Sequence, residues 1–349
     1  MTKAVILDHY KNYPSLEISD IFKLLHQSTF GCEHMVSSPE YALLRIEDEA
    51  KSLRAETSPK LDVLDGDFSR VHLSNLNSGL SPKTLTALFC LSSKKKQGSI
   101  RELEDKLDSV KGLIFCGKLP FDIKEFENAR AKWREQKYAP IHHSDNYRTL
   151  YNPAYRVISN EYIPFLPLFA KIDSMLAQDR IILAIDGGAA SGKSTLGALL
   201  QEIYGCSIFH MDDFFLRPEQ RTKERFAEIG GNVDRERFYN EVLIPLSKNE
   251  VVHYRPFDCG TFTLKDPIEV SPTPLSVIEG SYSMHPELSC RYDLSVFLDI
   301  SPELQKKRIE IRNGKELADR FFSEWIPLEN RYFEGFDIKS KCDIVIKVK

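Results

Sequence analysis

A glycine-rich segment in the second half of the chain follows closely on a run of apolar residues, Ile181 to Ile185. Residues 196–203, after the segment, have the pattern of a helix. The segment fits GxxxxGK[ST] and consists of Gly187, Gly188, Ala189, Ala190, Ser191, Gly192, Lys193, Ser194 and Thr195. A loop of small residues between a strand and a helix directs backbone N–H groups at a phosphate, and the helix N-terminus favours negative charge there. The segment predicts a nucleotide-binding loop.

Two side chains of this loop have expected roles. Lys193 reaches the β- and γ-phosphates, and the Ser194 hydroxyl ligates Mg²⁺. The loop by itself fits an ATPase, a GTPase or a kinase. Because no NKxD motif for reading guanine follows it, we expect ATP as the nucleotide.

Short apolar runs alternate with helical stretches throughout residues 180–349. This alternation is typical of a parallel sheet with crossover helices. We therefore predict an α/β fold of the P-loop NTPase type, a parallel five-stranded sheet flanked by helices. The predicted strands are Ile181 to Ile185, Cys206 to His210, Leu275 to Glu279, Leu294 to Leu298 and Asp343 to Val348.

Acidic residues end two of these strands. Asp212 and Asp213 follow the second strand, and Glu279 ends the third. Ligands of open α/β sheets bind at the carboxyl edge, so a carboxylate there can orient an acceptor hydroxyl or take its proton. Glu279 is placed to assist magnesium. The alternatives are that the two aspartates cap a turn and that Glu279 is a surface residue.

Residues 180–349 resemble the uridine kinase, nicotinamide riboside kinase and phosphoribulokinase group of P-loop kinases. Besides the loop, the resemblance rests on Asp212 to Phe215, Asn232 to Asp234 before Phe238, Tyr254 to Asp258, Ile278 to Gly280, Phe297 to Asp299, and the strand after Cys342. It implies an enzyme that uses ATP and Mg²⁺ to phosphorylate a hydroxyl of a small metabolite, such as a nucleoside, a riboside or a polyol-like compound.

The same resemblance implies roles for individual residues. Asp212 would be the general base, and Ser194, Asp212 and Glu279 would hold Mg²⁺. The catalytic cations would be Lys193, Arg308 and Arg312. The two arginines are four residues apart on one helix face, which could instead be a solvated basic face. The acceptor would be bound by Asp213, Asp234, Tyr254, Arg255, Phe257, Asp258 and Glu279.

Two features depart from uridine kinases. The pair Asp212-Asp213 is closer to the nicotinamide riboside kinase pattern, and the stretch 217–231 carries Arg221 and Arg225. Nucleoside specificity is therefore not carried over, and the identity of the acceptor stays open.

The first 140 residues resemble no family that we can name. Their apolar spacing predicts helices at 18–25, 41–53, 85–91 and 100–113, with one short strand at 70–73. We expect a mainly helical α+β domain at 1–140, a proline-rich linker and connecting helix at 141–179, and the P-loop domain at 180–349.

A cluster of soft ligands lies in the first domain at His26, Cys32 and His34, with His142 and His143 further along. Metal binding is one hypothesis for it. However, the spacing is not a standard zinc pattern, and hydrogen-bonded loop residues are the alternative.

Composition limits the partners. A net charge of −4 gives no cationic footprint for nucleic acid. The seven cysteines show no CxxC pair, and no signal peptide or membrane-length apolar window occurs, so we expect a cytoplasmic protein with reduced thiols. A homo-oligomer stays open. A switch ATPase that signals through the first domain to a protein partner is the alternative to a kinase.

Overall fold

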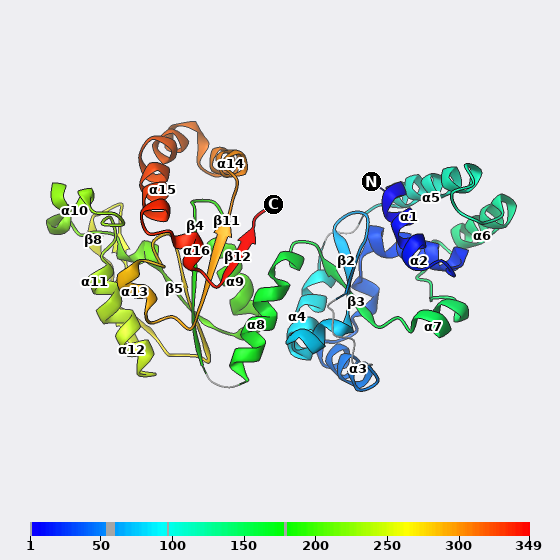
Figure 1. The fold of residues 1–349 in the computed structure, drawn as a ribbon, viewed down its shortest axis with the longest axis horizontal. Helices are drawn as coiled ribbons and strands as arrows, with labels where there is room; N and C mark the ends of the chain where they lie inside the picture. Colours follow the sequence, from blue (N-terminus) through cyan, green and yellow to red (C-terminus); the bar gives the residue numbers. More distant parts are fainter. Residues whose placement is uncertain (1, 54–59, 96–97, 178–179) are drawn as a thin grey trace. The chain divides into compact units, whose positions relative to one another are not determined.

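The computed structural model describes residues 2–53, 60–95, 98–177 and 180–349. The chain forms two compact units, Met1–Asp173 and Ser174–Lys349 (Figure 1). No helix within the described ranges combines the length and the apolar character that a membrane span requires.

The first unit consists mainly of helices. Their starts follow local capping signals: Ser99 and Glu102 form a reciprocal capping box, and Ser81 caps a helix whose first residue is Pro82. The helices are α1 (Thr2–Asn12), α2 (Ile18–Phe30), α3 (Pro39–Lys51), α4 (Pro82–Ser93), α5 (Ile100–Phe115), α6 (Ile123–Glu135) and α7 (Asp145–Tyr151). The four predicted helices correspond to α2, α3, α4 and α5.

The same unit contains a three-stranded antiparallel sheet where the sequence suggested a single strand. Its order is β1 (Leu61–Val63), β2 (Phe68–His72) and β3 (Tyr155–Ser159). Strand β3 is buried along its whole length and pairs antiparallel with β2, with His72 opposite Tyr155. It lies in the segment expected to be a linker, which thus contributes α7 and β3 to the first unit. The last residues of that segment, 178–179, lie outside the described residues.

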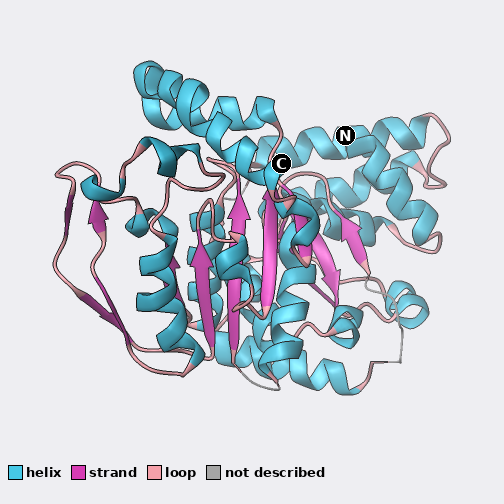
Figure 2. Cartoon of the chain, turned by 60° about the vertical axis from the view of Figure 1, so that its left-hand side comes forward, coloured by secondary structure: helices cyan, strands magenta, loops and turns pink. Residues whose placement is uncertain are grey.

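The second unit is built on a five-stranded parallel sheet, as predicted. Its order is β12-β11-β4-β10-β5, and every neighbouring pair is parallel. The strands are β4 (Ile181–Gly187), β5 (Ser207–His210), β10 (Leu275–Glu279), β11 (Leu294–Asp299) and β12 (Ile344–Lys347). The apolar runs of the three central strands, β4, β10 and β11, are buried because helices flank the sheet (Figure 2).

Helix α8 (Leu166–Leu176) lies mostly in the first unit and crosses the boundary between Asp173 and Ser174, and α9 (Lys193–Tyr204) follows β4. Residues between β5 and β10 form α10 (Lys223–Ala227), α11 (Arg235–Phe238), α12 (Ile244–Ser247) and two small antiparallel pairs, β6 (Val252–Tyr254) with β9 (Ile268–Val270) and β7 (Phe257–Asp258) with β8 (Thr263–Leu264). After β10 and β11 come α13 (Pro286–Ser289), α14 (Pro302–Arg320), α15 (Ile326–Gly335) and α16 (Ile338–Lys341). Helix α14 is interrupted at Gly314, whose φ is 71°.

Candidate active site

The glycine-rich loop turns tightly between β4 and α9, as its sequence requires. Gly187 has φ of 145°, and a Cβ atom there would lie 2.6 Å from the Leu298 carbonyl oxygen. Only glycine fits such a position without displacing backbone. Gly192, with φ of 100°, precedes the first residue of α9, and a Cβ there would meet no atom within 4 Å. The loop therefore leaves open space at the helix N-terminus.

The polar groups of the loop are arranged as donors. Lys193 Nζ donates to the carbonyl oxygens of Gly187 at 2.7 Å and Gly188 at 3.1 Å, and to Ser281 Oγ at 3.2 Å. The buried Ser191 hydroxyl has no hydrogen-bond partner among the described residues. A buried hydroxyl without a partner is costly, and a phosphate oxygen would satisfy it.

Glu279 connects the loop to the end of β5. Its Oε1 accepts a 3.1 Å hydrogen bond from Ser194 Oγ and is paired with His210 Nδ1 at 2.5 Å. Glu279 and His210 face each other in the β10 and β5 register. The hydrogen bond to Glu279 is the main cause that raises the pKa of His210 above its ordinary value. Because the strands run parallel, their carboxyl ends meet at one edge of the sheet, and these groups lie together there.

Asp212 lies one short turn beyond β5, close enough to Lys193 and Glu279 for electrostatic interaction. Its side chain is accessible to solvent, yet surrounding protein atoms remove part of its hydration. This desolvation, together with the charges of Glu279 and Asp213, raises the pKa of Asp212, while Lys193 and His210 act in the opposite direction. A carboxylate with a raised pKa is a better proton acceptor than an ordinary aspartate.

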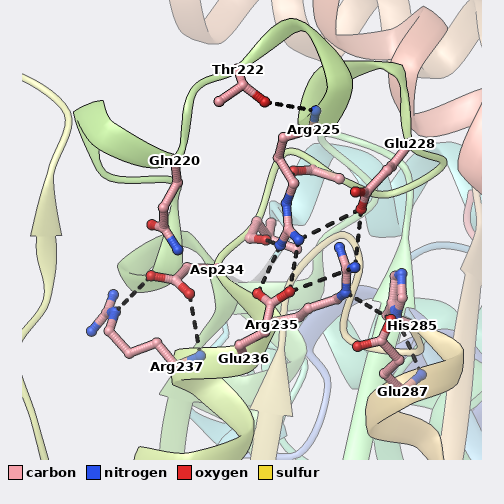
Figure 3. Close-up of polar contacts among 12 residues, drawn as sticks. Gln220, Thr222, Arg225, Glu228, Asp234, Arg235, Glu236, Arg237, His285 and Glu287 are labelled. Carbon is pink, nitrogen blue, oxygen red and sulfur yellow. Dashed lines mark hydrogen bonds and ion pairs between the residues drawn. The ribbon is translucent and has the colours of Figure 1, made fainter.

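Asp213 and Asp234 form a second polar group beside Asp212. Tyr254 OH donates to Asp213 Oδ2 at 3.0 Å, and Arg237 Nη2 donates to the Asp213 carbonyl oxygen at 2.9 Å. The buried Asp234 caps α11 by accepting from Arg237 N–H, and it is also paired with the Arg237 side chain (Figure 3). A second ion pair joins Asp234 to Arg217. Three residues predicted to bind an acceptor, Asp213, Asp234 and Tyr254, are therefore brought together.

A cavity of about 410 Å³ opens on this group. It is lined by Arg217, Gln220, Arg225, Asp234, Glu236, Arg237, Asn240 and Glu241. The arginines are matched by carboxylates: Arg225 pairs with Glu236, and Arg237 with Glu241. No loop residue from 187 to 195 lines it, so the cavity is distinct from the phosphate loop.

The remaining predicted acceptor residues are engaged in a hairpin. Arg255 donates to the carbonyl oxygens of Leu264 and Lys265. Asp258 accepts from Gly260 N–H at 2.8 Å, and this hydrogen bond is the main cause that lowers the pKa of Asp258. Phe257 is buried, and the segment β7 that carries it contacts the turn at residues 211–214.

The two predicted arginines of α14 lie in different surroundings. Arg308 Nη1 donates to the Ala190 carbonyl oxygen of the loop at 3.2 Å. Arg312 is hydrogen-bonded to the neighbouring Asn313 and lies over the Phe321 ring. Of the two, Arg308 contacts the loop.

Sequence reasoning missed a contact between α15 and the loop. The buried Glu329 accepts from the Ala189 N–H at 2.8 Å and from Ser281 Oγ at 2.6 Å. Tyr332, one turn later, donates to the buried Asp186 at 2.8 Å. Burial raises the pKa of Asp186 to about 6, against the effect of hydrogen bonds from Met284 N–H and other donors. The one sequence feature that pointed to this contact was the three-residue spacing of Glu329 and Tyr332, which places both on one face of the helix.

The metal hypothesis for the first unit finds no support. No group of three or more histidine, cysteine, aspartate or glutamate side chains in the described part of the chain is arranged to hold a metal ion. Cys32 is buried with Sγ 3.9 Å from the Phe89 carbonyl oxygen, and burial raises its thiol pKa to about 12. His26 and His34 stack edge to face at 5.1 Å. These residues pack the loop after α2.

Comparison with known proteins gives matches over about half of the chain, and no family model matches. The chain is 26% identical over 189 residues to a uridine kinase from Chlamydia pneumoniae, which covers 49% of this chain and 83% of that protein. It is 26% identical over 182 residues to the bifunctional alpha-galactosidase/sucrose kinase AgaSK from Mediterraneibacter gnavus, which covers 45% of this chain and 19% of that protein.

A solved structure described as a possible uridine kinase from Bacillus stearothermophilus matches 51% of this chain and 98% of its own, with 22% identity and a TM-score of 0.39. The sequence matches, together with the parallel sheet and the loop described above, support a likeness of this chain to uridine kinase-like P-loop kinases. They support a phosphotransferase in the broad sense.

Proposed function

We propose that this chain transfers the γ-phosphoryl group of ATP to a hydroxyl of a small metabolite, a nucleoside, a riboside or a polyol-like compound. One observation carries the proposal: Lys193, Ser194, Glu279 and Asp212 gather at one edge of the sheet. A separate cavity lined by Asp234 offers room for a small molecule. A loop that only binds a nucleotide does not require the aspartate or the cavity.

The phosphate loop supplies donors for the nucleotide. Lys193, which rests on loop carbonyl oxygens, would turn to the phosphates, because an ammonium group prefers a charged acceptor to a neutral one. Ser191 Oγ and the loop N–H groups would complete the cradle. The loss of the hydrogen bonds from Lys193 to the loop carbonyl oxygens is offset by charge-assisted hydrogen bonds to the phosphates.

The hard oxygen ligands needed for magnesium are present in Ser194, Glu279 and Asp212. Mg²⁺ held there would neutralise negative charge on the phosphates. His210 keeps the Glu279 carboxylate in place at the sheet edge. The positively charged imidazole that this pairing favours also limits repulsion between Glu279 and Asp212.

Asp212 would act on the acceptor. Its carboxylate takes the proton of the acceptor hydroxyl as the hydroxyl oxygen forms a bond to the γ-phosphorus, and the bond from that phosphorus to the bridging oxygen breaks to release ADP. Asp213 and Tyr254, which are hydrogen-bonded to each other, and Asp234, which lines the cavity, would orient the acceptor. Arg308, already at the loop, would approach the transferring group from α14.

The test is Mg²⁺-dependent ADP formation by the full chain with a panel of nucleosides, ribosides, sugars and polyols, using ATP and GTP in parallel. We expect one acceptor class to stimulate turnover with ATP, and Asp212→Asn to reduce the stimulated rate by about 10²- to 10⁴-fold. The affinity for ADP measured without Mg²⁺ should change little in this variant, because Asp212 does not belong to the phosphate loop.

Two controls sharpen the result. Lys193→Met should remove both basal and stimulated turnover, whereas Glu269→Gln, an exposed change on β9, should affect neither. If no acceptor stimulates the wild-type protein and basal hydrolysis ignores Asp212→Asn, the kinase proposal fails. A regulatory ATPase that signals to a protein partner would then be the better account.

A further inference from the structure

Three buried arginines in the first unit differ in how their charges are compensated. Arg130 is paired with Glu104, and Arg156 is paired with Glu49 at 2.9 Å. Arg70 is fully buried, at 0% exposure, and no carboxylate of the described residues lies within ion-pair distance of it. A buried charge without a counter-charge is strongly unfavourable, so the surroundings of Arg70 need an explanation.

The groups that do contact Arg70 are neutral. Its Nε donates to Gln27 Oε1 at 2.8 Å, Nη1 lies 3.2 Å from His9 Nε2, and the guanidinium stacks on the Tyr155 ring at 4.6 Å. Burial, and after it the charge of Arg70, lowers the pKa of His9 to about 3, so this ring is neutral near pH 7. The guanidinium thus receives no negative charge from its partners.

Two donors in this group have no acceptor. Arg70 Nη2 and Gln27 Nε2 are both buried and have no hydrogen-bond partner among the described residues. They belong to two side chains that are directly hydrogen-bonded to each other, so they lie close together. Buried N–H donors are almost always paired in native proteins. Two adjacent exceptions, one of them charged, point to an acceptor that arrives from outside the chain.

The nearby carboxylates are already committed to other partners. Asp62 faces Arg70 in the β1 and β2 register, yet its oxygens bind Tyr13 OH and the His72 ring. Asp20 accepts from Ser144 and is paired with the His143 ring. The charge of Arg70 helps to lower the pKa of Asp62, after the larger effect of the His72 hydrogen bond. Neither carboxylate forms an ion pair with Arg70, and each is hydrogen-bonded to a histidine and a hydroxyl of its own.

We propose that Arg70 and Gln27 form a binding site in the first unit for a small ligand that carries an oxyanion, either a carboxylate or a phosphate. A planar guanidinium with a free Nη2 is suited to such an oxyanion, and the adjacent amide N–H extends the same donor surface. The site offers donors and no free acceptor. It belongs to α2 and β2, and Gln27 lies in the segment His26 to His34 that the kinase proposal leaves without a role.

Hydrogen exchange of the full chain, read peptide by peptide, tests the site. The probes are inorganic phosphate and malonate, each compared with chloride at equal ionic strength. We expect one probe to protect peptides of residues 18–30 and 61–72 in the wild-type protein. In Arg70→Met the half-saturating concentration should rise at least about tenfold, because a charge-assisted hydrogen bond is lost. Arg130→Met removes a buried arginine that has carboxylate partners, and it should bind the probe as the wild type does.

Protection of residues 187–204 by phosphate reports the loop of the second unit, so the two sites are distinguished within one experiment. The proposal is overturned if neither probe protects the first-unit peptides of the wild-type protein, or if Arg70→Met is protected equally well. A crystal structure of the wild-type chain grown in the protecting probe gives a second criterion that does not depend on the folding of Arg70→Met. An oxyanion within hydrogen-bond distance of Arg70 Nη2 and Gln27 Nε2 supports the site, and a buried water there in place of the anion contradicts it.

Discussion

At the scale of single residues, Asp212 has the most demanding proposed role, because a general base must be ionised to accept a proton. Desolvation and the charges of Glu279 and Asp213 raise its pKa. We therefore predict that kcat/KM rises with pH and that the acid limb lies above the ordinary aspartate value of about 4. A pH profile of the stimulated reaction measures this limb. Asp212 would be excluded as the base if the acid limb lay at the same pH in Asp212→Glu as in the wild-type protein. It would also be excluded if the wild-type protein, still folded by circular dichroism, showed no acid limb.

Glu329 yields a second prediction at the same scale. Its carboxylate accepts a hydrogen bond from the Ala189 N–H, a loop group beside the expected position of the phosphates. Glu329→Gln keeps an oxygen acceptor for Ala189 and removes one negative charge. Relief of roughly 1 kcal/mol of like-charge repulsion should tighten ATP binding about fivefold. Calorimetric titration with ATP measures the affinity, and weaker binding would mean that the carboxylate mainly supports the shape of the loop.

The residues that sequence reasoning placed at the site are those fixed by local patterns. Ser194, Lys193 and Glu279 follow from a loop motif and from a strand end, and the structure brings them together. Glu329 was missed, because its contact with Ala189 joins positions 140 residues apart in the chain. Asp258 accepts from Gly260 N–H, and its role as an acceptor-binding residue stays a prediction, because a short motif cannot distinguish these two uses of a carboxylate.

At the scale of elements, the turn from β4 into the loop depends on a glycine. In Gly187→Ala, the new Cβ would clash with the Leu298 carbonyl oxygen at 2.6 Å while the backbone keeps an unfavourable φ. We predict that this change lowers the free energy of unfolding by more than about 2 kcal/mol and abolishes ADP binding. Urea unfolding and ADP titration are the measurements.

Gly205→Ala is the matched control for that change. Gly205 ends α9 with φ of 64°, and a Cβ there would meet no atom within 4 Å. Only the conformational cost of about 1 kcal/mol is expected, with ADP binding retained. Equal losses in the two variants would show that the close approach to Leu298 is unimportant.

The parallel sheet was predictable because its three central strands, β4, β10 and β11, are short apolar runs that are buried on both faces. The antiparallel sheet of the first unit was harder. Strand β1 has three residues with only Asp62 buried, and β3 carries Tyr155 and Arg156 shortly after a proline. Their strand character comes from pairing with β2, a contact between distant segments that local propensity does not contain.

At the scale of the whole molecule, buried histidines make stability depend on pH. In the first unit, burial lowers the pKa of His9 to about 3 and those of His26 and His143 to about 4. In the second, burial lowers the pKa of His285 to about 4. Between these values and 6.5 the unfolded chain binds more protons than the folded chain, so stability falls as pH falls through this window.

We predict a loss of roughly 2 kcal/mol for each such histidine between pH 7 and pH 5, and a greater loss in the first unit than in the second. Hydrogen exchange at the two pH values, corrected for the intrinsic exchange rate, follows the opening of each unit separately. Equal destabilisation of both units, or greater stability at pH 5, would contradict the assignment of neutral buried rings.

The central claim is that phosphate moves from ATP to a small hydroxylated molecule. The most direct measurement follows the label of [γ-³²P]ATP, incubated with Mg²⁺, the full chain and the acceptor panel, into small organic phosphates, orthophosphate or protein. We predict label in a small organic phosphate with the wild-type protein and none with Lys193→Met. Label that appears only as orthophosphate, or only on protein, would contradict the account.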